Sequence, residues 1–249
     1  MSGHSKWANI KHKKGRADAQ RGKIFTRISK EITISAREGG GDPAGNPRLR
    51  LAMQNARAVN MPNDNITKAI KKGTGEIEGV QYEEIVYEGY APNGVAVLLE
   101  TVTDNKNRTL PEIRSLMSKH GGNLGEAGSV AWNFERKGVI SISSNGKSED
   151  ELMEIVLNAD ADDLEYDDDT SRIISTMENF SIVNKYLEDN NFKIVEAKLE
   201  YIAKNIVNLT DVSVAQKVLK FIDIFEDHDD VQNVFYNFSI DDSIADKIE

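Results

Sequence analysis

The spacing of hydrophobic residues predicts helices over the first part of the chain. Apolar residues recur at helical intervals between Ile24 and Ile32, which predicts a helix over about residues 18–38. Similar spacing predicts a second helix that follows the turn of residues 42–47 and runs to about Val59. A short third helix follows the break at residues 61–64 and ends at Gly73 as a natural stop. Turn-forming residues separate the three segments, so we expect a small helical bundle.

From residue 82 onward, strand-like runs alternate with helical ones. Residues 82–134 hold two strands, a helix and a further short strand over residues 130–134. Over residues 135–203 the order strand, helix, strand, strand, helix, strand is that of a ferredoxin-like unit. One helix and one strand remain over residues 213–238, and neither buries its apolar side alone. We expect them to return and complete the first α+β unit.

These patterns predict a multidomain α+β protein. The N-terminal helical bundle is followed by two α+β domains, one of which is ferredoxin-like and inserted into the other. The expected domains are residues 1–78 for the bundle, residues 79–134 with 205–249 for the discontinuous α+β domain, and residues 135–204 for the insertion.

Charge is distributed unevenly between these parts. The net charge of the whole chain is −10 at pH 7. Residues 1–73 contain 16 basic and 5 acidic residues, a net charge of +11, so the remaining residues carry −21. Such asymmetry is typical of a basic nucleic-acid-binding module joined to an acidic body. It leaves the acidic domains for contacts with other proteins.

Basic residues of the N-terminal part are the candidate nucleic-acid contacts. Helical geometry places Lys23, Arg27 and Lys30 opposite the apolar stripe. Trp7 stands among lysines, where it either stacks on an exposed base or anchors the first residues to the bundle. A charged face is often only solvated, but here basic residues outnumber acidic ones roughly three to one. The candidates are Lys6, Trp7, Lys11, Lys13, Lys14, Arg16, Arg21, Lys23, Arg27, Lys30, Arg48, Arg50 and Arg57.

A polar motif stands at the expected junction of a strand and a helix. Asp104 or Asn105 is suited to cap the free backbone amides at the start of that helix. Asparagine, arginine and threonine at a helix N-terminus also suit an anion such as phosphate. Capping is the more ordinary role, and the two are compatible. The candidate anion site comprises Asn105, Asn107, Arg108 and Thr109.

The sequence carries no pattern that calls for a metal, a cofactor or catalysis. It contains no cysteine and only four scattered histidines. The acidic residues over 160–169 lack the glycine and final glutamate of a calcium loop, and neither glycine-rich stretch is followed by the Lys-Ser/Thr of a phosphate loop. We expect no metal, no cofactor and no enzymatic activity, with an enzyme acting on nucleic acid as the lowest-ranked alternative. The absence of cysteine and of a long apolar run predicts a cytoplasmic protein without membrane contact.

Short motifs spread over nearly the whole chain carry a family resemblance. Those of the N-terminal part are the most specific. The motifs are Gly3-His4-Ser5-Lys6-Trp7-Ala8-Asn9-Ile10-Lys11, Arg21-Gly22-Lys23-Ile24-Phe25-Thr26, Gly39-Gly40-Gly41-Asp42-Pro43, Asn46-Pro47-Arg48-Leu49-Arg50, Tyr87-Glu88-Gly89-Tyr90, Asp104-Asn105-Lys106-Asn107-Arg108-Thr109, Gly121-Gly122-Asn123-Leu124-Gly125 and Asp229-Asp230-Val231-Gln232.

In sequence and order these motifs resemble the YebC/PmpR family. The resemblance implies three domains: a helical bundle and two α+β domains, the last inserted into the middle one. It also implies bacterial cytoplasmic proteins described as DNA-binding transcriptional regulators. Mitochondrial relatives are translational activators, and a role at the ribosome is proposed for bacterial members.

Two functions therefore stand ahead of any other. The first is DNA binding that regulates transcription through the basic N-terminal domain. The second is a translation factor that uses the same surface on ribosomal RNA or tRNA. Neutralising phosphates does not distinguish DNA from RNA, so charge does not choose between them.

Overall fold

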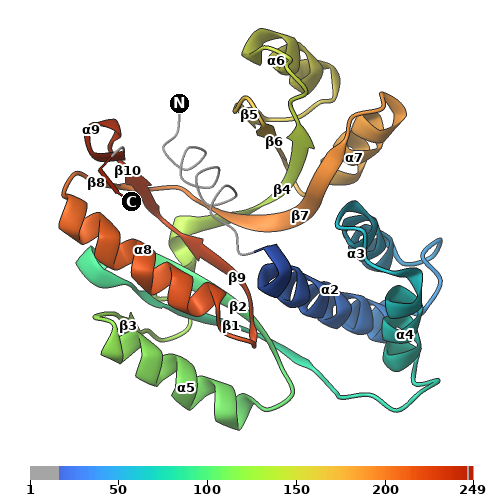
Figure 1. Cartoon of the computed structure of the whole chain (residues 1–249), viewed down its shortest axis with the longest axis horizontal. Coiled ribbons are helices and arrows are strands. Elements are labelled where there is room, and N and C mark those ends of the chain that lie inside the picture. Colours follow the sequence, from blue (N-terminus) through green and yellow to red (C-terminus); the bar gives the residue numbers. More distant parts are fainter. Residues whose placement is uncertain (1–16, 246, 249) are drawn as a thin grey trace. The chain divides into compact units, whose positions relative to one another are not determined.

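The computed structural model describes residues 17–245 and 247–248 (Figure 1). The described chain forms two compact units: residues 17–81 with 137–200, and residues 82–136 with the rest of the chain from 201 onward. The first compact unit thus contains both the helical segment and most of the inserted segment of residues 135–204. The three-domain boundaries expected from the sequence stay a prediction.

Three helices open the first unit and form the predicted bundle. α2 spans Ala17–Gly39, α3 Pro47–Ala58 and α4 Asn63–Thr74 (Figure 1). Asn46 caps α3, because its side-chain oxygen accepts the backbone N–H of Leu49 at 3.0 Å. The apolar core shared by the helices consists of Ile32, Ala36, Leu49, Ala52, Ala56, Met61, Ile66 and Ala69.

α4 does not end at Gly73, as the sequence predicts, but at Thr74. The residue that follows, Gly75, adopts the left-handed conformation with φ 79°. Gly73 instead lies where α4 approaches α2. A Cβ on Gly73 would stand 2.3 Å from the carbonyl oxygen of Thr33. Gly73 therefore allows two helix backbones to pack closely, and Gly75 supplies the turn.

The second part of this unit is the ferredoxin-like sheet with its two helices. The sheet order is β5-β6-β4-β7, with β6 antiparallel to both β4 and β5. This order confirms the predicted ferredoxin-like unit. The elements are β4 (Phe134–Ser143), α6 (Glu149–Asn158), β5 (Asp163–Glu165), β6 (Thr170–Ser175), α7 (Phe180–Asp189) and β7 (Ile194–Ala203). Its core includes Ile140, Ile142, Leu152, Val156, Ile173, Val183, Leu187 and Ala197.

The second unit is built on a four-stranded sheet of order β3-β1-β2-β9. β9 pairs antiparallel with β2, Tyr236 opposite Val97, so the C-terminal helix and strand do return to complete the first α+β unit. β8 and β10 form a separate parallel pair. The elements are β1 (Glu83–Tyr90), η1 (Pro92–Gly94), β2 (Ala96–Thr103), α5 (Lys106–Lys119), β3 (Asn123–Leu124), η2 (Ala131–Asn133), β8 (Val207–Leu209), α8 (Val212–Glu226), β9 (Val231–Tyr236), β10 (Phe238–Ile240) and α9 (Asp242–Ala245).

α5 and α8 pack on one face of this sheet. Ile113 and Met117 from α5 meet Phe221 and Phe225 from α8 in one apolar core with Val97 from β2. These side chains lie at helical spacing in α5 and α8, so their burial follows from the periodicity of the sequence. The packing holds the start of α5 at the end of β2, where the polar motif of residues 104–109 lies.

The predicted strand over residues 130–134 is wrong for most of its length. Residues 131–133 form the short helix η2, and the strand begins only at Phe134. The reason is a competing partner: the carboxylate of Glu88 accepts the backbone N–H groups of Val130 and Ala131 at 2.9 and 2.8 Å. Backbone groups bound by that side chain are not available to a strand ladder.

Candidate nucleic-acid interface and the α5 polar network

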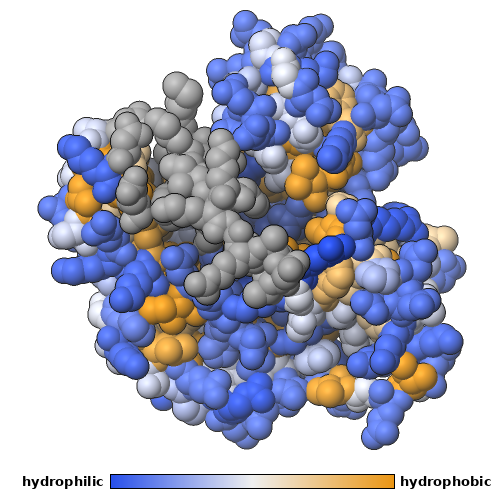
Figure 2. All heavy atoms as spheres, viewed as in Figure 1, coloured by the Kyte–Doolittle hydropathy of each residue, from blue (hydrophilic) through white to orange (hydrophobic). Residues whose placement is uncertain are grey.

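On the face shown in Figure 2, hydrophilic residues cover most of the described surface and hydrophobic residues gather only in small groups. We therefore describe the candidate interface by the exposure and the contacts of its charged side chains. Among the described candidates, Arg21, Lys23, Arg50 and Arg57 are exposed, and Arg27 is half-buried. The candidates outside the described residues are Lys6, Trp7, Lys11, Lys13, Lys14 and Arg16.

Lys30 differs from its neighbours on α2. The sequence places it on an outward cationic stripe, but in the structure it is only 9% exposed. The same holds for the following turns, since every residue from Ile32 to Ala36 is buried. A helix that is enclosed on all sides has no solvated stripe, so periodicity misplaces Lys30. The exposed cationic residues of α2 lie toward its two ends, at Arg21, Lys23 and Arg37.

Arg48 is held against α2 by two carboxylates. Its Nε lies 2.7 Å from Oε1 of Glu31, and its Nη1 lies 2.8 Å from Oε2 of Glu38. Both carboxylates belong to α2, so the guanidinium joins α2 to α3. The charge of Arg48 is thereby compensated within the domain. A contact between Arg48 and nucleic acid stays a prediction.

α4 adds three exposed cations that the candidate set omits. Lys68, Lys71 and Lys72 are exposed, while Ile66 and Ala69 on the opposite side are buried. The periodicity of α4 already separates these two faces. The packing of α4 against α2 places the three lysines in the same bundle as Arg21 and Lys23, as the sequence predicts.

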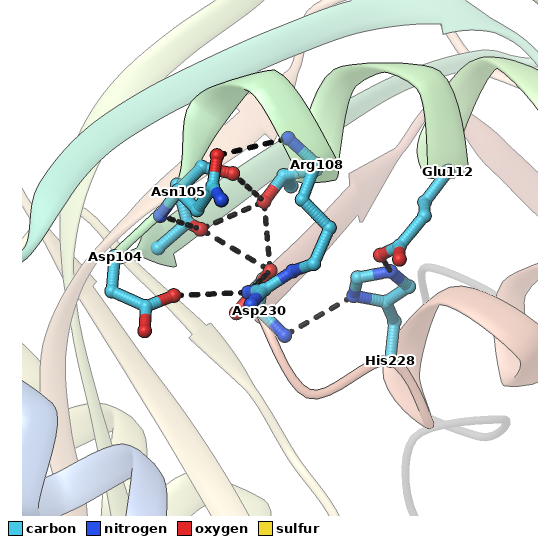
Figure 3. A network of polar contacts seen from close by, with 8 residues as sticks. Asp104, Asn105, Arg108, Glu112, His228 and Asp230 are labelled. Atoms are coloured by element: carbon cyan, nitrogen blue, oxygen red, sulfur yellow. Dashed lines mark hydrogen bonds and ion pairs between the residues drawn. The ribbon is translucent and has the colours of Figure 1, made fainter.

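The polar motif at the start of α5 forms a dense network (Figure 3). Asn105 caps α5, because its side-chain oxygen accepts the backbone N–H of Arg108 at 3.1 Å. Arg108 donates from Nη2 to Asp104 at 3.0 Å and to Asp230 at 2.7 Å. The hydroxyl of Thr109 also lies 2.7 Å from Oδ2 of Asp230. The predicted capping role of Asn105 thus agrees with the geometry.

The centre of this network is a buried carboxylate that the candidate site did not include. Asp230, just before β9, is 5% exposed, and two of the four predicted anion-site residues, Arg108 and Thr109, contact it. The chain's own Asp230 therefore lies where an external anion was expected. Binding of a free anion at these residues stays a prediction.

Neighbouring groups continue the network on both sides. The backbone N–H of Asp230 donates to Nδ1 of His228 at 3.1 Å, and Nε2 of the same ring lies 3.4 Å from Oε2 of Glu112 (Figure 3). Burial raises the pKa of Tyr82, and the negative charges of Asp104 and Asp230 raise it further.

No group of three or more His, Cys, Asp or Glu side chains suited to a metal ion occurs within residues 17–245 and 247–248. Within the same residues, no helix is long and apolar enough to cross a membrane.

Comparisons with known proteins agree over nearly the whole chain. Residues 5–76 match the family model of the TACO1/YebC protein N-terminal domain, and residues 82–238 match that of the TACO1/YebC second and third domain. A protein of Dictyoglomus turgidum is 55% identical over 245 residues, which is 98% of each chain. One of Halothermothrix orenii is 53% identical over 250 residues, 100% of this chain and 99% of the other. Both are named probable transcriptional regulatory protein.

A solved structure shows the same fold. The crystal structure of the conserved hypothetical protein Aq1575 from Aquifex aeolicus superposes with a TM-score of 0.86 at 44% sequence identity. The match covers 92% of this chain and 94% of that one. The α+β multidomain fold and the family resemblance expected from the sequence are both confirmed: the chain belongs to the TACO1/YebC family.

Proposed function

We propose that this protein is a non-enzymatic regulator of transcription that binds DNA through its basic N-terminal domain. The observation that carries the proposal is the separation of charge, +11 over residues 1–73 against −21 over the rest. Lys and Arg neutralise phosphates and release counterions, which supplies most of the affinity of a sequence-independent contact. The acidic domains are left for contacts with other proteins.

The exposed cations of the bundle support this assignment. Arg21 and Lys23 of α2, Arg50 and Arg57 of α3, and the three lysines of α4 all reach solvent. An acidic body repels a polyanion, so we expect most of the phosphate contacts on this part of the molecule. Transcription, rather than another use of nucleic acid, is favoured by the names of the relatives in Dictyoglomus and Halothermothrix.

Two sets of variants, in which neutral glutamine replaces basic residues, test the proposal. Arg21→Gln, Arg50→Gln and Arg57→Gln together remove three exposed charges of the bundle. Arg114→Gln, Lys217→Gln and Lys220→Gln remove three exposed charges of the second unit and form the matched control. Binding to duplex DNA is measured by fluorescence anisotropy between about 50 and 200 mM salt.

For the unaltered chain we expect log affinity to fall with log salt at a slope near −5, as for about five or six neutralised phosphates. The bundle variant should lower the affinity and flatten the slope by up to about 3, while the control should keep both. A salt-independent affinity, or equal losses in the two variants, would contradict the proposal.

The translation alternative is tested in the same buffer. Sedimentation with ribosomes is compared with binding to random duplex DNA at one salt concentration. Binding to ribosomes without measurable binding to duplex DNA would replace the transcriptional role with an action on the ribosome through rRNA or tRNA.

A further inference from the structure

The loop between β3 and β4 is organised around a buried carboxylate. Glu88 of β1 is 9% exposed and accepts three backbone N–H groups of this loop, from Gly128 at 2.6 Å, Val130 at 2.9 Å and Ala131 at 2.8 Å. The backbone carbonyl of Glu88 also accepts a bond from this loop, from the backbone N–H of Gly125 at 2.8 Å. Charge-assisted bonds of this kind are stronger than neutral ones, so the loop is held in one conformation.

The same loop fixes the ring of Trp132. The indole N–H donates to the carbonyl of Ser129 at 3.0 Å, and the hydroxyl of Tyr90 donates to that same carbonyl at 3.2 Å. Trp132 lies in η2, between the buried residues Val130 and Phe134. The backbone on both sides of the indole is thus anchored.

Trp132 itself is nevertheless 65% exposed. A single exposed hydrophobic residue is ordinary and is not by itself a site. This one differs because the surrounding loop holds it rigidly outside the core, although an indole is among the largest apolar surfaces that a chain can bury. Its only polar group is already bound within the loop, so the ring offers a partner its flat faces alone.

Two cations lie close to Trp132 along the backbone. The backbone N–H of Lys204 donates to the carbonyl of Asn133 at 2.7 Å, which places an exposed lysine beside the next residue. Arg136, also exposed, holds its guanidinium 5.7 Å from the ring centre of Tyr201. Exposed aromatic and basic residues in the same segment are the residue types that hold single-stranded nucleic acid.

We infer that Trp132 is a stacking platform for an unpaired base, which gives the second unit its own contact with single-stranded nucleic acid. The inference rests on the proposed binding of nucleic acid and adds to the duplex contact of the bundle a second contact with an unpaired base. A base is favoured over an apolar pocket of a protein because stacking requires only the ring faces, whereas buried tryptophans at protein interfaces usually also use their N–H. Duplex DNA keeps its bases paired and offers no such face.

The chain has two tryptophans, Trp7 and Trp132, so a Trp7→Phe variant makes Trp132 the sole indole fluorophore. This variant is titrated with a single-stranded oligo(U) or oligo(dT), and with a duplex of the same length. Stacking should quench the emission of Trp132 and protect it from acrylamide, and the duplex should do neither. Binding of both probes is followed independently by anisotropy of a labelled strand.

Substitution then tests the contribution to affinity. Trp132→Ala should weaken single-strand binding about 5- to 140-fold, the range for one stacked base, while Trp132→Phe keeps part of it. Duplex binding should be unchanged in both. Ile206→Ala is the control, because Ile206 is an exposed hydrophobic residue of the same unit, 43% exposed, and should leave both affinities unchanged. Thermal unfolding checks that each variant is folded.

The outcomes separate this inference from the proposed function. Normal duplex binding with no quenching of Trp132 by either single strand overturns the inference and leaves the proposed function standing. Failure to bind any nucleic acid overturns both. If Trp132→Ala loses only a protein partner and keeps its single-strand affinity, Trp132 is a protein-docking residue and the inference is wrong.

Discussion

Asn55 of α3 pairs with the backbone of Ala197 in β7 as a neighbouring strand would. Its Nδ2 donates to the carbonyl of Ala197 at 2.7 Å, and the backbone N–H of Ala197 donates to its Oδ1 at 2.9 Å. β7 is an edge strand of its sheet, so both backbone groups would otherwise lack a partner. A side-chain amide thus covers an edge that would be open to unwanted pairing.

Replacement of Asn55 by Ala should expose this edge. Removing both bonds leaves the polar backbone groups of Ala197 unpaired, so we expect a loss of about 1–2 kcal/mol in the free energy of unfolding. Hydrogen exchange at the amide of Ala197 should become faster. Asn55→Asp should cost more, because a carboxylate oxygen then faces the carbonyl of Ala197.

The control is Gln54→Ala. Among the described residues, Gln54 pairs with the side chain of Asn184, at 3.1 and 3.4 Å, and this contact involves no backbone group of β7. Exchange at Ala197 should therefore stay slow. Unchanged exchange in Asn55→Ala as well would mean that the edge is protected by other contacts.

Glu88 makes the stability of the second unit depend on pH. Burial raises the pKa of its carboxyl, but the backbone N–H groups of Gly128, Val130 and Ala131 outweigh this and hold the pKa below the usual value of 4.5. A carboxyl whose pKa is lowered on folding stabilises the folded state fully above its unfolded pKa. That contribution is lost as the pH falls through the lowered pKa. Stability should therefore decline below about pH 4.5.

Glu88→Gln should remove this part of the pH dependence. The side-chain NH2 of glutamine would also face a backbone N–H donor of the loop. We therefore expect a loss of about 1–3 kcal/mol in the free energy of unfolding at pH 7. Urea unfolding between about pH 3 and 7, followed by Trp132 emission in the Trp7→Phe background, measures both effects. Glu126→Gln, at an exposed position of the same loop, is the control and should preserve the profile. An unaltered acid limb in Glu88→Gln would refute the assignment.

Arg108 and Asp230 differ in exposure, and this predicts unequal costs. The side chain of Asp230 is 7% exposed and that of Arg108 is 44% exposed. Arg108→Met removes the guanidinium that balances the buried carboxylate of Asp230, so we expect it to lower the free energy of unfolding by more than a change at Asp104 does. Asp104→Asn weakens only the exposed pair with Arg108, and its cost should stay below about 1 kcal/mol.

A double variant checks that the buried charge of Asp230 is the cause of the loss of stability in Arg108→Met. In Arg108→Met with Asp230→Asn, the buried charge is removed together with its partner, so the combined loss should be smaller than the sum of the two single losses. Urea unfolding of the three variants gives this coupling directly. Strict additivity would show that the two side chains act independently.

Two glycines within helices should respond to alanine in opposite directions. Gly22 of α2 has no atom within 4 Å of an added Cβ, so Gly22→Ala should stabilise the bundle by about 0.5–1 kcal/mol. At Gly73 the same Cβ would stand 2.3 Å from the carbonyl oxygen of Thr33 and 2.7 Å from the Cβ of Ala36. Gly73→Ala should therefore lower the thermal midpoint, despite the better helix propensity of alanine. Equal shifts in the two variants would contradict the close packing of α2 and α4.

Much of the fold follows from the sequence by itself, because it is encoded in local periodicity. The 3.6-residue spacing around Ile28 and Ile32 marks α2, and the order of strands and helices over residues 135–203 suffices for a ferredoxin-like sheet. The return of the last helix and strand also follows, since neither buries its apolar side alone. The charge separation that carries the proposed function is likewise a property of the sequence.

Only the tertiary structure decides which polar groups meet. Glu88 reaches Val130 across 42 positions and Arg108 reaches Asp230 across 122, and no local pattern encodes such pairs. Periodicity likewise assigns Lys30 to a solvated face, but Lys30 and all residues from Ile32 to Ala36 are buried. A periodic pattern describes one element with one buried face, whereas burial depends on everything that packs around that element.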